Sequence, residues 1–189
     1  MPRPAILPLI DWKAVFGSGL DYEAWLAAAE SAEQRDKLEA QRQALRLDPA
    51  VAGFLAALPR PVHVVAIAED WCGDVVRHAP VLQRMAEAGP ALKVRYIRRE
   101  QHPEVFARFL TNGGEAIPKF IFLSEAFVEC GNWGPMPEAC KELIARGKAC
   151  GDVASARKKV SARYELDSAR REVVAELLRL VDIAASQEP

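Results

Sequence analysis

The side chain best suited to covalent chemistry in this sequence is Cys72, within Glu69-Asp70-Trp71-Cys72-Gly73-Asp74-Val75. A β-branched apolar run precedes this segment and a helical pattern follows it. A cysteine at such a junction lies near unpaired helix N–H groups and the positive end of the helix dipole, which favour the thiolate. The position therefore predicts Cys72 as a catalytic nucleophile. The alternative is a small apolar residue that fills a strand end.

Asp74 is the second predicted catalytic residue, and it would act on the thiol in two opposing ways. It suits the first turn of a helix, but its negative charge close to Cys72 would raise the thiol pKa. The residues alone leave the outcome open.

The other cysteines are too widely spaced for a disulfide framework: Cys130, Cys140 and Cys150. Cys140 shares a predicted helix face with Leu143 and Ile144, which favours a core role. Cys130 falls at a strand end. Cys150 is predicted in a loop and could resolve a bond to Cys72, although nothing in the sequence places it nearby.

Trp71-Cys72-Gly73-Asp74 resembles the active site of the thioredoxin superfamily, where Trp-Cys-Gly-Pro-Cys stands at the same strand-to-helix junction. Pro80 follows where that family kinks its helix, and Ile117-Pro118 precedes a predicted hairpin, where the family has its cis-proline. Three motifs are similar to those of a bacterial thioredoxin-like subgroup: E-D-W-C-G-D at 69–74, N-G-G-x-x-I-P at 112–118 and W-G-P-x-P at 133–137. The resemblance covers about residues 60 to 147.

The resemblance implies a substrate groove beside Cys72. In the superfamily the cis-proline packs near the reactive sulfur, and the backbone of the preceding residue pairs with an extended substrate segment, which is strand addition. The substrate-binding residues it implies are Trp71, Gly73, Ile117, Pro118 and Trp133. Trp71 and Trp133 would be flat apolar walls, and a packed turn is the alternative for Trp133.

Two departures from the family limit the mechanism. Val75 stands where a dithiol thioredoxin has its resolving cysteine, so ordinary exchange within Cys-x-x-Cys is excluded. Ala66 stands where the family carries a buried acid, so that proton acceptor is missing as well.

Apolar periodicity indicates which elements position these residues. It predicts a surface arm over the first twenty residues, a helix of roughly 25 residues from Asp21, and these further elements: a helix at 49–58, a strand at 62–68, a helix at 75–86, a strand at 92–97, a helix at 105–110, a hairpin of 119–123 and 127–130, a helix at 140–147 and two helices beyond 151. The order across residues 62 to 147 predicts an α/β mixed central sheet with helices on both faces. Together with the family resemblance it implies a thioredoxin fold with extra N-terminal and C-terminal helices.

We expect one compact domain with three parts: an N-terminal arm and helices at 1–59, a thioredoxin-like core at 60–147 and a C-terminal helical extension at 148–189. The outer helices are expected to pack on the sheet. The alternative for the last helix is a contact between two copies of the chain.

Composition narrows the class of protein. The chain has 189 residues, half of them apolar, and 25 Lys and Arg against 26 Asp and Glu, so neither nucleic acid nor a membrane is favoured as a partner. The early apolar run at 5–10 is broken by proline and too short for a secretion signal or a spanning helix, and a cytoplasmic location is expected. The three histidines are scattered, no Cys-x2-Cys pair occurs, and neither metal nor cofactor is predicted.

Two functions fit these residues. In the first, the chain is a monothiol oxidoreductase in which Cys72 attacks a protein or small-thiol disulfide and an external thiol, such as glutathione, releases the product. In the second, it is a non-catalytic thioredoxin-fold module that binds a peptide or protein partner. The oligomeric state is left open.

Overall fold

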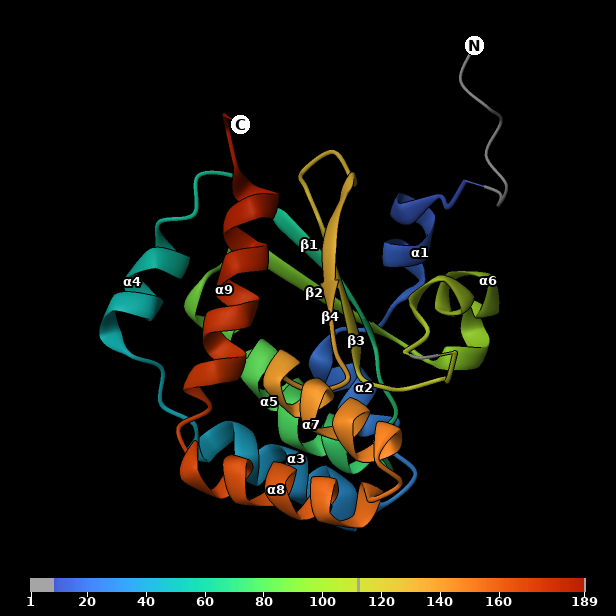
Figure 1. Cartoon of the computed structure of the whole chain (residues 1–189). Helices are drawn as coiled ribbons and strands as arrows, with labels where there is room; N and C mark the ends of the chain where they lie inside the picture. The colour runs from blue at the N-terminus through green and yellow to red at the C-terminus, as the bar shows by residue number, and fades with distance from the viewer. Residues whose placement is uncertain (1–8, 112, 189) are drawn as a thin grey trace.

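The structure is a computed structural model that describes residues 9–111 and 113–188 (Figure 1). The strands are β1 (Val62–Ile67), β2 (Leu92–Ile97), β3 (Lys119–Leu123) and β4 (Glu129–Trp133). The helices are α1 (Trp12–Ser18), α2 (Tyr22–Ala27), α3 (Ala32–Ala44), α4 (Pro49–Ala56), α5 (Gly73–Ala88), α6 (Pro103–Phe106), α7 (Glu138–Ala149), α8 (Val153–Leu166) and α9 (Arg171–Ala185), with short 3-10 turns at Arg99–Gln101 and Ala107–Phe109.

The four strands form one mixed sheet in the order β2-β1-β3-β4. β1 runs parallel to β2, as expected across a helical crossover, and antiparallel to β3, which forms an antiparallel hairpin with β4. The predicted mixed α/β sheet is therefore confirmed. In the hairpin, the second strand begins at Glu129, later than the predicted start at residue 127.

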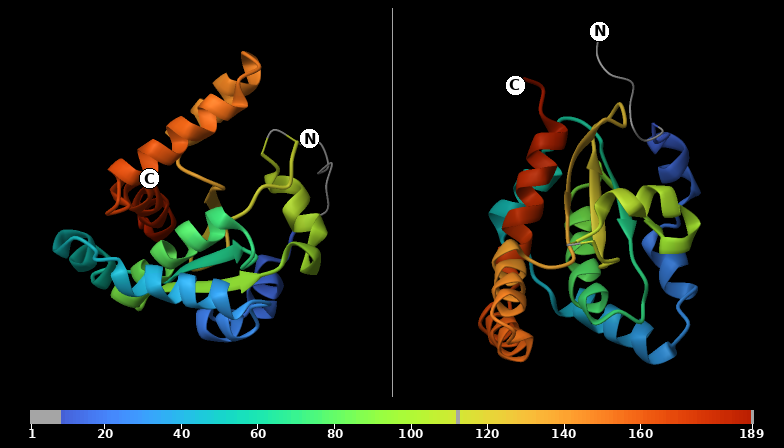
Figure 2. Two further views of the ribbon diagram at one scale, coloured as in Figure 1. Left: turned by 90° about the horizontal axis from the view of Figure 1, so that it is seen from below. Right: turned by 45° about the vertical axis from the view of Figure 1, so that its right-hand side comes forward.

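The central strands are buried on both faces, because helices cover the sheet from two sides. All residues of β3 are buried, and β1 leaves only His63 partly exposed. α5 and α9 contact each other on one face, where α9 packs on β4, β3 and β1. α1 packs on β1 and β2, and α1 and α6 lie on the side of the sheet opposite α9 (Figure 2).

α7 and α8 form an antiparallel hairpin that projects from the body of the molecule (Figure 2, left). A small buried cluster holds the two helices together: Cys140, Ala156 and Val160. The expectation that the outer helices pack on the sheet is thus confirmed for α9 and wrong for α8, which packs on α7. The helix that closes this face of the sheet is α9, beyond the predicted core segment 60–147.

The N-terminal region is more regular than expected. The predicted surface arm contains α1, which begins after Asp11 because the Asp11 carboxylate accepts the N–H of Ala14 at 3.0 Å. Trp12 and Val15 of α1 are buried against the core. The arm prediction is therefore wrong for residues 12–18, and its first eight residues lie outside the described ones.

The single long helix predicted from Asp21 is also wrong, because it is divided into α2 and α3. Asp21 caps α2 as expected, and its carboxylate accepts the N–H of Ala24 at 2.9 Å. The break at residues 28–31 follows from a tertiary contact: Asp70 accepts the N–H of Glu30 at 3.1 Å. Of the helices described, none is long and apolar enough to cross a membrane.

Candidate functional site

Cys72 lies at the junction that the sequence indicates, between the end of β1 and the start of α5. It is the N-cap residue of α5, with extended backbone angles, and the N–H of Val76 donates to its carbonyl at 2.9 Å. Its side chain is half-buried. The sulfur is therefore partly shielded from solvent and lies at the positive end of a 16-residue helix.

The Cys72 thiol rests against the loop that precedes β3. The Ile117–Pro118 peptide bond is cis, and Sγ of Cys72 donates to the carbonyl oxygen of Ile117 at 3.5 Å. Both Ile117 and Pro118 are buried. The structure thus brings together Cys72, Ile117 and Pro118, as the resemblance implies.

Burial determines the direction in which the pKa of the Cys72 thiol is shifted, which the sequence leaves open. Desolvation raises the pKa of Cys72 above its usual value, and it outweighs the N–H groups of Val75 and Asp74, which lower the pKa. The negative charge of Asp74 raises the pKa further, and the more distant charge of Arg99 lowers it. At neutral pH the resting group is a thiol.

Asp74 belongs to a partly buried polar network with Tyr164 and His78 that sequence reasoning missed. Burial raises the pKa of the Asp74 carboxyl, while Arg77 and a hydrogen bond from the Tyr164 hydroxyl oppose the rise. The Tyr164 oxygen also lies 3.3 Å from Nε2 of His78, which is fully buried. Burial lowers the pKa of His78 well below its usual value, so the ring is neutral. The Tyr164 hydroxyl can donate to Asp74 and accept from Nε2 of His78, while the buried Nδ1 of His78 has no hydrogen-bond partner in the described residues.

Arg99 contacts Glu69 and Trp71, in the segment that leads from β1 to Cys72. Oε1 of Glu69 accepts the backbone N–H of Arg99 at 3.1 Å and its Nε at 3.4 Å. The Arg99 guanidinium lies 5.2 Å from the centre of the Trp71 ring and pairs with Glu115 at 3.3 Å. Trp71 is held in place by this cation–π contact and is 50% exposed, so it presents an apolar surface to solvent.

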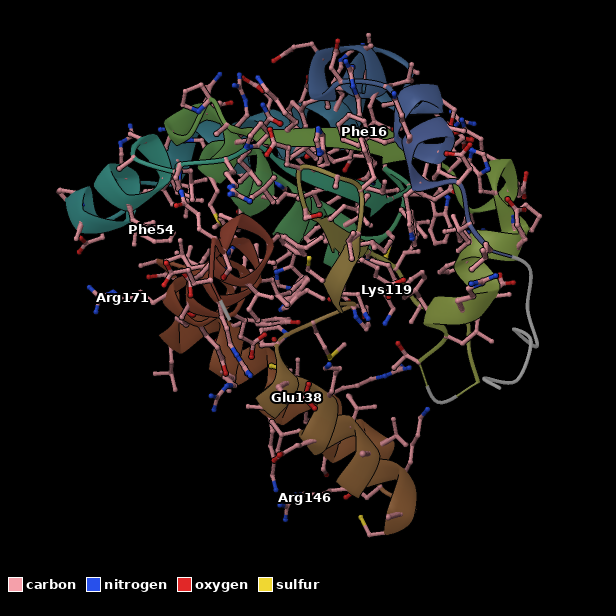
Figure 3. The ribbon with its side chains drawn as sticks, turned by 90° about the horizontal axis from the view of Figure 1, so that it is seen from above. Phe16, Phe54, Lys119, Glu138, Arg146 and Arg171 are labelled. Atoms are coloured by element: carbon pink, nitrogen blue, oxygen red, sulfur yellow. The ribbon has the colours of Figure 1, made fainter. Side chains whose placement is uncertain are left out.

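A groove of about 400 Å³ opens over Cys72. One side is formed by Trp71 and the loop residues Thr111 and Gly114–Ile117, and the other by Pro135, Met136 and α7. α7 contributes Lys141, Ile144 and Lys148. Figure 3 shows Lys119 on the side of the sheet that faces α7, whose start is marked by Glu138. The groove is thus bounded by the α7–α8 hairpin as well as by the fold core.

A second cis-proline loop packs directly on the first. The Gly134–Pro135 bond is cis, and a Cβ added at Gly134 would overlap the carbonyl group of Pro118. Gly134 has φ of 121°, which also disfavours a side chain. Nζ of the buried Lys119 donates to the Gly134 carbonyl at 2.9 Å, and burial lowers the pKa of Lys119 to about 8. The W-G-P motif therefore supports the floor of the groove.

Three predicted substrate-binding residues are not part of the groove lining: Gly73, Pro118 and Trp133. Trp133 is 5% exposed, stacks on Phe120 and donates from Nε1 to Glu176 at 2.6 Å. The prediction of an exposed wall at Trp133 is wrong, because α9 covers that side of β4. Gly73 is exposed, is not part of the groove lining, and a Cβ added there would meet no atom.

The remaining cysteines have surroundings that differ from that of Cys72. Cys140 is fully buried between α7 and α8, and burial raises its pKa to about 11, which confirms the core role. Cys150 is exposed at the end of α7, and Sγ of Cys130 donates to the Val128 carbonyl at 3.3 Å. In the part of the chain that the structure describes, no three His, Cys, Asp or Glu side chains are grouped to hold a metal ion.

Comparison with known proteins agrees with this geometry. A family model described as thioredoxin matches residues 19–157. A crystal structure of a protein of unknown function from Pseudomonas aeruginosa is 18% identical, with a TM-score of 0.72, and the match covers 92% of this chain and 98% of that one. An HIV epitope scaffold is also 18% identical, with the same coverage and a TM-score of 0.73. These two structures establish similarity of fold only. A search of curated proteins finds no match.

The family match includes the sheet, the Cys72 junction and the Ile117–Pro118 loop, and it extends over more than half of the sequence. The chain therefore belongs to the thioredoxin family.

Proposed function

We propose that this protein is a monothiol thioredoxin-like oxidoreductase. The observation that carries the proposal is the position of the Cys72 sulfur, on the floor of an open groove and 3.5 Å from the carbonyl of the residue before the cis-proline. A sulfur placed there meets a disulfide that enters the groove.

The proposed exchange takes two steps, and an external thiol supplies the reducing equivalents. The Cys72 thiolate attacks one sulfur of the substrate disulfide, forms a mixed disulfide and expels the other sulfur as a thiolate, which takes up a proton. A small thiol such as glutathione then attacks the substrate sulfur of the mixed disulfide. This second step returns Cys72 as a thiolate and leaves the substrate joined to the external thiol.

The surroundings of Cys72 support an external resolving thiol. Val75 occupies the position of a resolving cysteine and is fully buried. Trp71 gives the groove an apolar lip, and no backbone carbonyl of the described residues accepts the N–H of Ile117. An extended substrate segment could pair with that N–H, which is the strand addition that the family resemblance implies.

The experiment is a turnover assay with a glutathionylated model peptide, with and without glutathione. Cys72 should attack the glutathione sulfur, so that without glutathione the wild type releases at most one peptide per protein molecule. Added glutathione, which leaves as glutathione disulfide, should allow repeated turnover, and Cys72→Ser should abolish both. Cys130→Ser and Cys150→Ser are the matched controls and should retain the wild-type rate. Turnover that survives Cys72→Ser would contradict the proposal, and loss of turnover in Cys150→Ser would show that Cys150 resolves the bond.

The second candidate is a non-catalytic binding module, and the raised pKa of Cys72 favours it. A resting thiol with a raised pKa is a poor nucleophile at neutral pH. If this candidate holds, wild type and Cys72→Ser should bind an extended peptide equally well, and neither should turn over. A Cys72-dependent mixed disulfide that glutathione resolves would exclude it.

A further inference from the structure

A second cavity, separate from the Cys72 groove, lies between the end of α3, the middle of α5 and the turn that joins α8 to α9 (Figure 1). Its volume is about 220 Å³. Three arginines from three different parts of the chain line it: Arg46, Arg77 and Arg170. The uncharged polar groups in the lining are those of Gln41 and Ser168, and no acidic side chain lines it.

The positive charge of this cavity is not neutralised within the described residues, because none of the three arginines forms an ion pair with a carboxylate there. Their contacts are with uncharged groups. Arg46 donates to the Leu45 carbonyl at 3.2 Å, Arg170 donates to the Gln41 side chain at 3.0 Å, and the Arg77 guanidinium stacks 4.1 Å from the centre of the Tyr164 ring.

The neighbouring carboxylates are engaged elsewhere. Burial lowers the pKa of Arg170, and the negative charge of Asp167 opposes that shift. The Asp167 carboxylate accepts hydrogen bonds from the backbone N–H groups of Arg171 and Glu172 at 2.9 and 3.0 Å, and so caps α9. The charge of Arg77 opposes the rise in the pKa of the Asp74 carboxyl on burial, and this carboxyl accepts a hydrogen bond from the Tyr164 hydroxyl. The three guanidinium groups therefore retain donors for a ligand that carries negative charge.

Arg170 is held in an unfavourable state at this cavity. Its φ is 58°, in the left-handed region that a residue with a side chain rarely adopts. Burial and the like charge of Arg77 lower the pKa of its guanidinium. Arg170 therefore combines a strained backbone with a guanidinium whose charged form is disfavoured by burial and by Arg77, and a bound anion would supply a favourable interaction for that charge.

We propose that this cavity binds a small, multiply charged oxyanion, a phosphate or a phosphate monoester, through the guanidinium groups of Arg46, Arg77 and Arg170. Guanidinium groups match the oxygens of phosphate with paired hydrogen bonds, and three of them suit an ion with more than one charge. The site is independent of the redox function proposed for Cys72.

A volume of about 220 Å³ is enough for a phosphate group with a short organic substituent, and the cavity is open to solvent. The floor formed by Pro80 and Val81 is apolar and would contact the substituent.

The test is calorimetric titration of the full chain with inorganic phosphate and with glycerol 3-phosphate, against chloride at equal ionic strength. Both phosphates should bind saturably at one site. Arg77→Gln and Arg170→Gln should each weaken binding by roughly 10- to 150-fold, the equivalent of a charged hydrogen bond of about 1.5–3 kcal/mol. Arg146→Gln is the control with the same change in net charge. Arg146 lies on the projecting α7 and is 80% exposed (Figure 3), so this variant should bind within twofold of the wild type.

Amide chemical-shift changes on addition of phosphate give a second readout on the wild type, which needs no folded variant. They should be confined to residues 41–46, 77–81 and 168–171. The absence of saturable binding, equal weakening in Arg146→Gln, or shifts located elsewhere would each overturn the proposal. Sedimentation with phosphatidic acid vesicles without any effect of the soluble phosphates would indicate a lipid surface instead and would also overturn it.

Discussion

At the scale of single residues, the reactivity of Cys72 results from a competition between burial and the end of a helix. The helix N–H groups stabilise the thiolate, but desolvation is the larger influence and raises the pKa. Asp74 and Arg99 adjust this balance with opposite charges. The chemistry of the site therefore depends on side chains from two other segments, Arg99 directly and Tyr164 through Asp74.

The first prediction concerns the pH dependence of Cys72 alkylation. Because the thiolate reacts and its pKa is raised, the rate should increase about tenfold per pH unit at neutral pH and level off only above the usual thiol pKa of about 8.5. Asp74→Asn should shift the profile to lower pH, and Arg99→Gln should shift it to higher pH. The measurement is iodoacetamide labelling followed by mass spectrometry.

In the same labelling experiment Cys140 is an internal control, because it is fully buried and should react only on unfolding. A labelling midpoint for Cys72 below that of a free thiol would show that the helix end outweighs burial. Labelling of native Cys140 at the rate of Cys72 would contradict the packing of α7 on α8.

The second prediction compares a partly buried tyrosine, Tyr164, with a fully buried one, Tyr96. Tyr164→Phe removes the hydroxyl that serves both Asp74 and His78, and should cost about 1–3 kcal/mol because both groups lose a hydrogen-bond partner. Tyr96→Phe removes a hydroxyl that has no partner in the described residues, and should be neutral or stabilising. Urea unfolding measures both variants. Equal destabilisation would show that the network adds nothing to stability.

At the scale of elements, the site depends on how the start of α5 meets two cis-proline loops. Cys72 caps α5, Ile117 precedes β3, and Gly134 follows β4 in contact with Pro118. The strand pairing of β1, β3 and β4 sets these three positions relative to one another. A change in any one of these loops should therefore affect the others.

The third prediction tests the contact between the loops. Gly134→Ala should cost more than about 3 kcal/mol, because the new Cβ overlaps the Pro118 carbonyl and the backbone has a positive φ. Gly53→Ala is the matched control in the interior of α4, where the Cβ meets open space. It should stabilise the protein by about 0.5–1 kcal/mol. Thermal unfolding measures both, and tolerance of Gly134→Ala would contradict the packing of these loops.

The fourth prediction uses the first turn of α5. Val75→Cys places a thiol at the position of a resolving cysteine and should give partial insulin reduction with a dithiol, whereas the wild type should be nearly inactive. Activity should stay partial, because Ala66 supplies no buried acid and Asp74 disfavours the thiolate. Cys72→Ser in the same background should abolish it. A 72–75 disulfide without a gain in activity would favour the binding module.

At the scale of the whole molecule, the α7–α8 hairpin stands apart from the main core. Its buried cluster is separate from the core that joins the sheet to α5 and α9. Glu176 of α9 ties the hairpin to the body, since its carboxylate accepts the N–H of Glu138 at 3.0 Å and that of the Trp133 ring. The hairpin also carries Lys141, Ile144 and Lys148, so the groove depends on its position.

The fifth prediction is that α8 unfolds locally before the core. Its amides should exchange with solvent faster than those of β1 and α9 because, among the described residues of this helix, only Ala156 and Val160 are buried. Tyr164→Phe should accelerate this exchange further, while Tyr96→Phe should not. Hydrogen exchange followed by mass spectrometry resolves the segments. Equal protection of α8 and β1 would show that the hairpin belongs to the main cooperative unit.

The strands, the strand-to-helix junction at Cys72 and the lack of a resolving thiol and a buried acid could all be predicted from the sequence. The β-branched run before Cys72, the alternation in β2 and the helical spacing after Gly73 are local patterns, and local patterns predict local elements. Set against the thioredoxin pattern, Val75 and Ala66 likewise predict that the resolving thiol and the buried acid are absent. The family resemblance added the position of the cis-proline, and the structure confirmed it.

The surroundings of the Cys72 site depend on tertiary contacts, which local sequence patterns do not predict. Trp71 and Trp133 both lie in motifs that contain glycine, yet α9 covers Trp133 while Trp71 is half-exposed. Arg99 and Tyr164 reach the site from distant segments whose sequence carries no signal of that contact. The pKa of Cys72 could not be predicted from the sequence for the same reason. Its largest cause is desolvation, which depends on every atom packed around the sulfur and not on the charges beside it in the chain.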